Sequence, residues 1–266
     1  MDTCRGFEAQ RDHLSGDGVN VKRLASLGVA LVLGLTGFTV SAPAHSVSVE
    51  RLPDLRMLKP SNFTIQNTGT EKRLRFQTVI HNAGTGKFGV QLRRPDTSTK
   101  RMTVRQRIYR ADGTWRNVDV PGTHGFYAGD GHDHWHVYRL QQFTIRRVNA
   151  DGSLGPVLAG GAKTGFCFFD NYKVNLGLPN APQNPHYTTC GDANSLSVLE
   201  GLSVGWGDRY SATTAYQWIK INGLKDGKYR IHVTADPSGW FLESNNTNNR
   251  AFRTVRITGN TVRVLT

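Results

Sequence analysis

Cysteine is scarce in this sequence, with three residues among 266. Cys4 lies in a segment that we expect to be removed, so Cys167 and Cys190 remain. A single pair excludes a dense disulfide framework, and an even pair in an exported protein predicts one disulfide. It would close a loop of about 22 residues and contribute roughly 3 kcal/mol in the chain-entropy estimate. Two separate free thiols are the alternative.

Sustained helical periodicity is also absent after residue 44. Short segments instead alternate apolar and polar residues and end in turns rich in Gly, Asn or Asp, such as the hairpin turn at 111–114. These segments are 74–81, 87–92, 103–109, 137–145, 216–221, 229–234 and 251–257. They predict an all-β fold, namely a β-sandwich-like single domain with long loops over residues 45–266.

A long apolar run occurs at residues 24–40, after the basic pair Lys22-Arg23 and before the small residues 41–44. This order is typical of a secretory peptide, so we interpret residues 1–44 as a signal region with a polar lead-in, cleaved after Ala44. The lead-in also suggests a natural start near Val21. A membrane anchor is the alternative, but the run is short for a span and contains several Gly. We therefore expect a secreted protein.

Acidic residues are few: 20 Asp and Glu stand against 33 Lys and Arg, which gives a net charge of +13. The charges balance within residues 1–44, so the excess belongs to the mature chain. Such a charge favours anionic partners, for instance a cell-wall polymer, with plain solubility as the alternative. Because we find no recognition helix and no basic-aromatic stacking motif, we expect no nucleic-acid partner.

Three histidines alternate in one short run: His132, His134 and His136. On an extended strand, side chains two residues apart share a face with a spacing of about 7 Å, and long imidazoles can converge on one ion. Three nitrogen ligands leave a coordination position open, as in a working metal centre. A strand that exposes histidines by accident is the alternative. Imidazole suits zinc, copper, iron and nickel, so the run alone does not name the metal.

Two further positions gain meaning from their surroundings. Lys163 lies in Gly-Gly-Ala-Lys-Thr-Gly-Phe-Cys, just before an aromatic strand. Tyr210 lies in a Gly-rich loop that starts at Gly201 and leads to Gln-Trp-Ile at 217–219. Each has an ordinary explanation: a solvated lysine, and a loop-packing tyrosine whose hydroxyl is wet.

In this order the segments resemble the catalytic domain of the lysyl oxidase family of copper amine oxidases. The His-x-His-x-His run resembles the copper motif of that family. Gly-x-Lys-x-x-Phe-Cys resembles the segment of its cofactor lysine, and Gly-Leu-Ser-x-Gly-x-x-Asp-x-Tyr that of its cofactor tyrosine. The resemblance runs from about Leu52 to the end of the chain and implies a bacterial-type secreted member. Its two mature cysteines are fewer than animal members carry, so substrate specificity is not transferred.

The resemblance implies that the three histidines bind copper and that Lys163 and Tyr210 form lysyl tyrosylquinone. Copper can support oxidation of a phenol by O₂, which redox-inert zinc cannot. Asp208, two positions before Tyr210, is our candidate base, with a turn-capping role as the alternative. The implied activity converts primary amines, peptidyl lysine included, to aldehydes with release of hydrogen peroxide and ammonia.

Some family members also bind calcium near the two ends of this domain. The positions that correspond here carry oxygen ligands, which calcium prefers; they are Asp54, Glu243, Asn245, Asn248 and Asn249. Asn245 stands where an Asp is familiar, which predicts lower affinity. Without the resemblance this Asn-rich segment is simply a turn.

Two other classes of protein stay open. One is a non-catalytic secreted β-sandwich that binds metal or cell wall, and the other is a zinc hydrolase built on the three histidines. The hydrolase lacks an adjacent base, because on a strand Asp133 would point to the opposite face from its neighbours. For an oxidase, the positive charge repels polycationic substrates and favours small amines or lysines on acidic partners.

Overall fold

The computed structural model describes residues 48–128 and 131–265, so the predicted signal region 1–44 lies outside the described residues. The chain divides into two units, residues 1–45 and 46–266, and the strands below all belong to the second. The described residues contain strands and turns but no α-helix, which confirms the all-β prediction. Among them, no helix offers the length and apolarity needed to cross a membrane.

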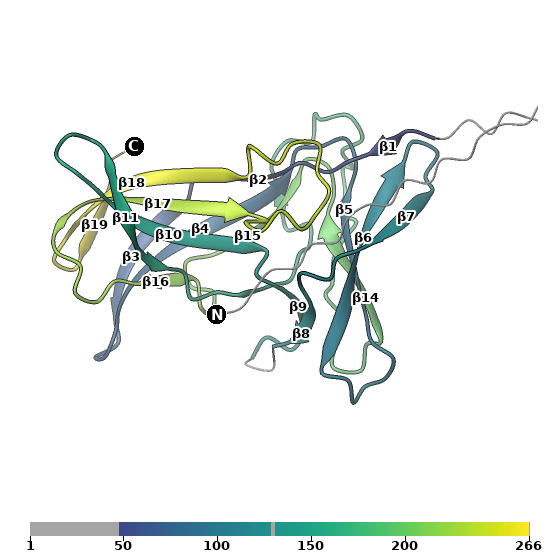
Figure 1. Cartoon of the computed structure of the whole chain (residues 1–266), viewed down its shortest axis with the longest axis horizontal. Coiled ribbons are helices and arrows are strands. Elements are labelled where there is room, and N and C mark those ends of the chain that lie inside the picture. The colour runs from purple at the N-terminus through teal and green to yellow at the C-terminus, as the bar shows by residue number, and fades with distance from the viewer. Residues whose placement is uncertain (1–47, 129–130, 266) are drawn as a thin grey trace, which may run out of the picture. The chain divides into compact units, whose positions relative to one another are not determined.

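The strands of the described chain form three antiparallel sheets (Figure 1). The eight-stranded sheet contains β1 (Glu50–Arg51), β5 (Phe88–Arg93), β6 (Arg101–Arg110), β7 (Trp115–Asp119), β8 (Gly125–Tyr127), β9 (Trp135–Tyr138), β12 (Gly165–Phe166) and β14 (Ser197–Leu202). The six-stranded sheet contains β2 (Leu55–Met57), β3 (Ser61–Asn67), β4 (Lys72–Asn82), β13 (Tyr172–Lys173), β15 (Trp206–Tyr210) and β16 (Trp218–Lys220). The five-stranded sheet contains β10 (Gln141–Val148), β11 (Leu154–Gly160), β17 (Gly227–Ala235), β18 (Arg250–Thr258) and β19 (Thr261–Val264).

One hydrophobic core joins the three sheets, because strands of each sheet turn an apolar face inward. Phe76 of β4 meets Phe143 of β10 edge to face, with ring centroids 5.3 Å apart, so the six- and five-stranded sheets share a core. Phe88 of β5 contacts Phe168 and Phe241 in the same way, which brings in the eight-stranded sheet. Such aromatic pairs contribute about 0.5–1.5 kcal/mol beyond their buried area.

Two local predictions from the sequence are wrong. The expected strand at 137–145 is two strands, because Arg139 adopts a φ of 57° and turns the chain between β9 and β10. Tyr210 is not in a Gly-rich loop: it ends β15, and Gly205, with a φ of 77°, makes the turn after β14. A glycine carries no Cβ penalty in that conformation, so a two-strand unit is compatible with the Gly-rich sequence.

The predicted disulfide is confirmed, with Cys167 and Cys190 joined and their Cα atoms 5.9 Å apart. Both residues also hold neighbouring elements through their backbone. The Cys190 carbonyl accepts a hydrogen bond from the Trp135 amide at 3.0 Å, at the start of β9. The Cys167 carbonyl accepts one from the Tyr210 hydroxyl at 2.6 Å. The disulfide therefore lies between the strand that follows the histidine run and the predicted cofactor tyrosine.

Candidate metal and cofactor site

The three histidines converge, although the strand predicted for them is shorter than expected. β9 begins at Trp135, so His136 lies on a strand while His132 and His134 precede it in a turn, where the His134 amide donates to the His132 carbonyl at 2.7 Å. One ring nitrogen from each residue nevertheless lies within 4.8 Å of the other two. A turn followed by a strand thus brings together side chains that we expected on one strand face.

The donor set fits a transition-metal ion. His134 Nε2 and His136 Nε2 lie 3.0 Å apart, close to the roughly 3.3 Å that separates two nitrogens bound at about 2 Å to one tetrahedral ion. Burial, the nearby Lys163 ammonium and the other two imidazoles lower the pKa of His136 to about 3. The neutral imidazole keeps the lone pair that a metal requires. Three neutral imidazoles suit copper or zinc and do not choose between them.

Lys163 is buried, not solvated. It lies between β11 and β12 and is 6% exposed. The backbone on both sides is anchored: the Ala162 amide donates to the Trp218 carbonyl at 2.9 Å, and the Thr164 carbonyl accepts from the Arg139 amide at 2.7 Å. Burial of a lysine is costly, so this position is typical of a functional site rather than of a surface cation.

Tyr210 lies beside Lys163. It is 8% exposed, and the Lys163 Nζ lies 5.0 Å from the centroid of its ring. Phe166 of β12 packs edge-on against the Tyr210 ring, with centroids 5.6 Å apart, and so fixes the ring plane. The two residues that the sequence paired by resemblance are therefore neighbours in space, and Lys163 is also near enough to His136 to lower its pKa.

Asp208 faces the same phenol. It lies two residues before Tyr210 on β15, 1% exposed, so it is part of a strand and not a turn cap. Asn171 Nδ2 donates to Asp208 Oδ1 at 2.5 Å. Burial raises the pKa of Asp208 to about 8, against the lowering effects of the neighbouring Tyr210 hydroxyl, the Asn171 hydrogen bond and the Lys163 charge. A carboxyl group with this pKa can exchange a proton near neutral pH.

Sequence reasoning missed two neighbours of this site, Asn171 and Glu200, and gave no role to a third, Phe166, which it quoted only as part of the lysine motif. Glu200 of β14 is fully buried, and burial together with the nearby Asp208 raises its pKa well above the usual range. An acidic residue inside the apolar segment Val-Leu-Glu-Gly-Leu was the signal available for Glu200. Asn171 offered none, and the lysine motif did not indicate the packing of Phe166, because only the fold brings Asn171 to Asp208 and Phe166 to Tyr210.

Two hollows meet at Lys163. A cavity of about 80 Å³ is lined by His132, His136, Lys163 and Tyr216 among others. A second hollow of about 410 Å³ is lined by Lys163 and Thr164 together with residues of β10 and the segment after β17. Lys163 thus lies between the histidine cluster and a space large enough for a small ligand.

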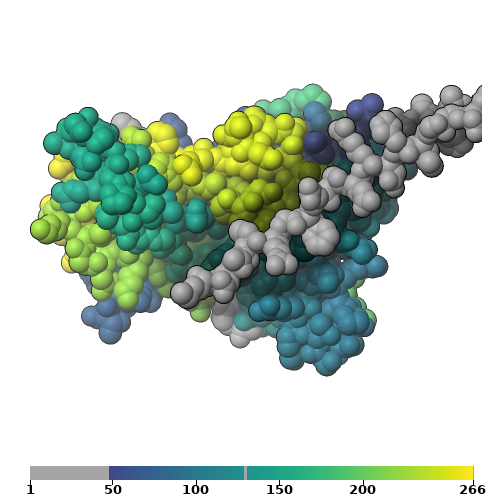
Figure 2. All heavy atoms as spheres, viewed as in Figure 1, coloured from purple at the N-terminus to yellow at the C-terminus, as the bar shows by residue number. Residues whose placement is uncertain are grey.

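A second polar cluster forms where β2 approaches the segment between β17 and β18, whose atoms, in yellow, reach the surface in Figure 2. Asn248 Nδ2 donates to Asp54 Oδ2 at 3.3 Å, and Asn249 Nδ2 donates to Glu243 Oε1 at 2.8 Å. Asp54 Oδ1, Asn248 Oδ1 and Asn249 Oδ1 are buried without a hydrogen-bond partner in the described chain. Buried oxygens without donors fit a cation that prefers oxygen ligands.

Glu243 and Asn245, both in the predicted calcium set, differ in burial: Glu243 is partly buried and Asn245 is exposed. Burial raises the pKa of Glu243 to about 7, despite hydrogen bonds from the Leu55 amide and Asn249. Asn245 is exposed, and its Oδ1 accepts from the amide and hydroxyl of Thr247 at 2.9 and 2.7 Å. Asn245 therefore caps its own turn, and the structure gathers Asp54, Glu243, Asn248 and Asn249.

The fold and the site define an all-β protein in which a three-histidine cluster adjoins a buried lysine and tyrosine. The model of the lysyl oxidase family matches residues 113–266, more than half of the chain, and the chain belongs to that family. The family membership expected from the sequence is thereby confirmed.

Individual relatives are similar to this chain at 25–29% identity. Lysyl oxidase homolog 1 of Homo sapiens is 29% identical over 131 residues, 47% of this chain and 20% of that protein. Protein-lysine 6-oxidase of Sus scrofa is 29% identical over 134 residues, 50% of this chain and 49% of that protein. Lysyl oxidase homolog 2 of Xenopus laevis is 25% identical over 264 residues, 92% of this chain and 28% of that protein. The chain thus spans about half of these relatives' length or less.

Proposed function

We propose that this chain is a secreted copper amine oxidase that converts primary amines, peptidyl lysine included, to aldehydes. The overall reaction consumes the amine, O₂ and water, and releases the aldehyde, ammonia and hydrogen peroxide. The observation that carries the proposal is the placement of the Lys163 Nζ 5.0 Å from the Tyr210 ring centroid, beside a cluster of three imidazoles. A protein that only bound metal would not need a buried lysine and a buried phenol there.

The residues would divide the work as follows. His132, His134 and His136 would hold copper, and Lys163 and Tyr210 would supply the nitrogen and the ring of lysyl tyrosylquinone. Copper and this quinone would together provide the two-electron chemistry that links amine oxidation to O₂ reduction. Asp208 would accept the proton that leaves the substrate carbon, because its pKa of about 8 matches that task near neutral pH.

The test is to express the full chain with copper under air, digest it and map its peptides by mass. We expect a covalently linked pair of peptides containing Lys163 and Tyr210, a coloured adduct with phenylhydrazine, and peroxide release from a primary amine. Tyr210→Phe and Lys163→Arg should abolish all three. The matched controls Tyr172→Phe and Lys173→Arg, on β13, should abolish none.

The other classes of function give distinct outcomes. Two unlinked peptides of native mass after full copper loading, without peroxide release, would favour a metal-binding or wall-binding protein. Hydrolysis that depends on zinc and the three histidines would favour the hydrolase.

We also propose that Asp54, Glu243, Asn248 and Asn249 bind calcium, supported by the three buried oxygens that lack donors in the described chain. A ligand at 100 times its Kd stabilises by about 2.7 kcal/mol, so saturating calcium should raise Tm by roughly 5–10 °C. Asp54→Asn should remove most of this shift, whereas the exposed control Asp119→Asn should keep it. Equal shifts in both variants, or equal shifts with magnesium, would contradict the assignment.

A further inference from the structure

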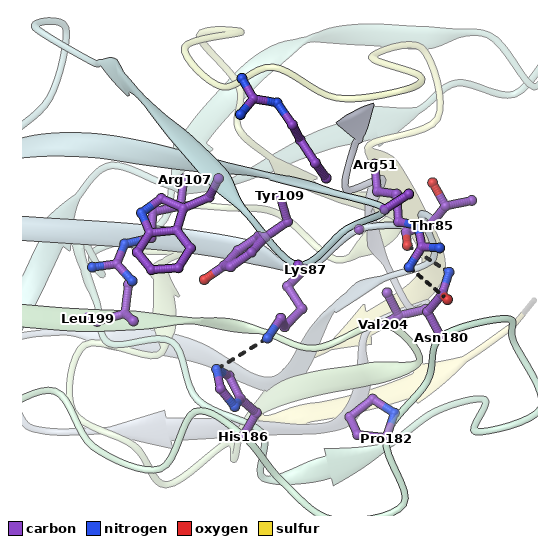
Figure 3. Close-up of a pocket in the computed structure, with 15 residues that line it drawn as sticks. Arg51, Thr85, Lys87, Arg107, Tyr109, Asn180, Pro182, His186, Leu199 and Val204 are labelled. Carbon is purple, nitrogen blue, oxygen red and sulfur yellow. Dashed lines mark hydrogen bonds between the residues drawn. The ribbon is translucent and has the colours of Figure 1, made fainter. Parts of the chain in front are cut away.

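A cavity of about 480 Å³ lies on the outer face of the eight-stranded sheet (Figure 3). It is separate from the site described above, because neither the three clustered histidines nor Lys163 nor Tyr210 lines it. Strand alternation builds this face: Arg107 and Tyr109 of β6 turn outward, because Ile108 between them is fully buried. Arg51 of β1 pairs with Tyr109 across the ladder. The volume of this cavity is within the range of pockets that hold small ligands.

Cations dominate the cavity. Figure 3 shows Arg107 and Arg51 on either side of Tyr109 and Lys87. Within the described chain, the ion pairs closer than 4.0 Å include none of these three cations. Arg51 donates to Asn180 Oδ1 at 3.0 Å, and the Lys87 Nζ lies 3.5 Å from His186 Nε2. No Asp or Glu lines the cavity, and Glu50 lies 3.9 Å from a fourth lining cation, Arg110, so an anion is the missing complement of the other three.

The partial burial of these groups sharpens that need. The Arg107 Nε is buried and has no hydrogen-bond partner in the described chain. Burial lowers the pKa of Lys87, the Asp170 charge opposes this, and the nearby Arg107 charge adds a smaller lowering effect. An anion placed between Lys87 and Arg107 would relieve their repulsion and satisfy unpaired donors.

Aromatic and apolar side chains flank the charges. Trp115 of β7 is 48% exposed, and the Arg107 guanidinium lies 4.9 Å from its ring centroid. The Lys87 Nζ lies 4.8 Å from the Tyr109 ring centroid. Leu199 completes the apolar lining on β14. The cavity therefore offers fixed cations next to ring-sized apolar surfaces, which suits a ligand that combines an anionic group with a ring.

We propose that this cavity binds a sugar unit that carries a carboxylate, as in an acidic polysaccharide. The indole and phenol would pack on the C–H face of the sugar ring, and Lys87, Arg107 and Arg51 would hold its carboxylate. An acidic peptide is the competing occupant, since Arg clusters also recognise acidic motifs, and the exposed ring of Trp115 favours a sugar over it. The disulfide indicates an oxidising compartment, where acidic glycans rather than nucleic acids are the abundant polyanions.

Binding of hexagalacturonate to the full-chain protein, measured by calorimetry, tests the proposal. We expect the double variant Lys87→Gln/Arg107→Gln to bind hexagalacturonate at least about tenfold more weakly than the unmodified chain. Each of the two substitutions removes a charge-assisted hydrogen bond to the ligand. The control Arg256→Gln/Arg263→Gln removes the same charge from exposed positions on β18 and β19 and should change Kd less than about twofold. If both double variants lost the same affinity for hexagalacturonate, the proposed site would be wrong and the binding would reflect diffuse charge attraction.

Trp115→Ala separates ring recognition from charge recognition. It should weaken hexagalacturonate about tenfold and leave the weaker binding of hexaglutamate unchanged. Hexaglutamate or a single-stranded oligonucleotide that binds more tightly than hexagalacturonate, with the same dependence on Arg107, would overturn the sugar assignment.

This site stands apart from the proposed amine oxidation. Tyr210→Phe should bind hexagalacturonate like the unmodified chain, and Lys87→Gln/Arg107→Gln should oxidise a small amine at the unmodified rate. An inactive chain that still binds the glycan would therefore count against the oxidase alone. Unchanged thermal unfolding of the Lys87→Gln/Arg107→Gln variant shows that any lost binding is local.

Discussion

Three polar side chains from different parts of the chain are buried together: His136 at 5%, Lys163 at 6% and Tyr210 at 8% exposure. Each of these groups costs free energy when it leaves water, and their mutual contacts recover only part of that cost. Structural cores are usually built from residues without this penalty. The burial of these three side chains next to one another therefore supports a chemical role for them rather than a structural one.

The metal assignment depends most directly on His136, the buried member of the triad. His136→Ala should weaken copper binding more than about 100-fold, because loss of an outer partner alone costs 10–100-fold. His124→Gln is the matched control, since His124 stacks on Tyr138 outside the cluster. Metal content by mass spectrometry after dialysis measures both. Retention of a full equivalent of copper by His136→Ala would refute the assignment.

At the scale of elements, β9 and β12 position the triad by close packing. Gly165 of β12 has no side chain, and a Cβ there would lie 2.5 Å from Phe126 Cζ and 2.9 Å from His136 Nδ1. Two short strands thus meet at a glycine because the imidazole needs the space. The placement of the His136 ring consequently depends on a residue that is not one of the three histidines.

Gly165→Ala should displace the His136 ring and weaken copper binding about tenfold, although the variant retains all three histidines. Gly155→Ala on β11 is the control, because the nearest atom to its Cβ would be 3.7 Å away. Competition with a chelator measures the affinity. An unchanged affinity in Gly165→Ala would show that the ring can move without loss.

Sequence alternation predicted the elements well where one face is buried, as in β4, whose expected span 74–81 lies within Lys72–Asn82. It failed at residues 132–134, because the His134 amide bonds back to His132 and none of the described strands includes these residues. The ligands could still be named, since their convergence needs short sequence spacing and not a particular backbone. Asn171 could not be named, and Phe166 was named only as part of the lysine motif, because Asn171 reaches Asp208 and Phe166 reaches Tyr210 only through tertiary contacts.

At the scale of the whole molecule, acid–base balance is unusual because buried carboxyl groups accompany the site. Burial raises the pKa of Glu200 well above its ordinary value and that of Asp208 to about 8. In the unfolded chain both ionise above about pH 4, so the folded state holds extra protons and loses stability as pH rises. The buried histidines act in the opposite sense: burial lowers the pKa of His81 and His232 to about 4, which costs stability below about pH 6.5.

Glu200→Gln isolates one of these effects. Relative to the unmodified chain, its free energy of unfolding should rise with pH between 5 and 8, by at most about 1.4 kcal/mol per pH unit. Glu71→Gln, at a surface carboxylate paired with Arg73, should show no such trend in this range. Urea titrations at several pH values give the comparison. A difference that stays constant with pH would mean that Glu200 ionises normally in the fold.

The disulfide described above has a topological consequence. Cys167 and Cys190 both lie within the stretch of chain bounded by Lys163 and Tyr210. Once the proposed lysine–tyrosine bond forms, the polypeptide would contain one covalent ring nested inside another, the outer ring joining the ends of β11 and β15 from different sheets. Assembly must then precede maturation, and a matured chain that is denatured would return to its native state from a far smaller set of conformations than a newly made one.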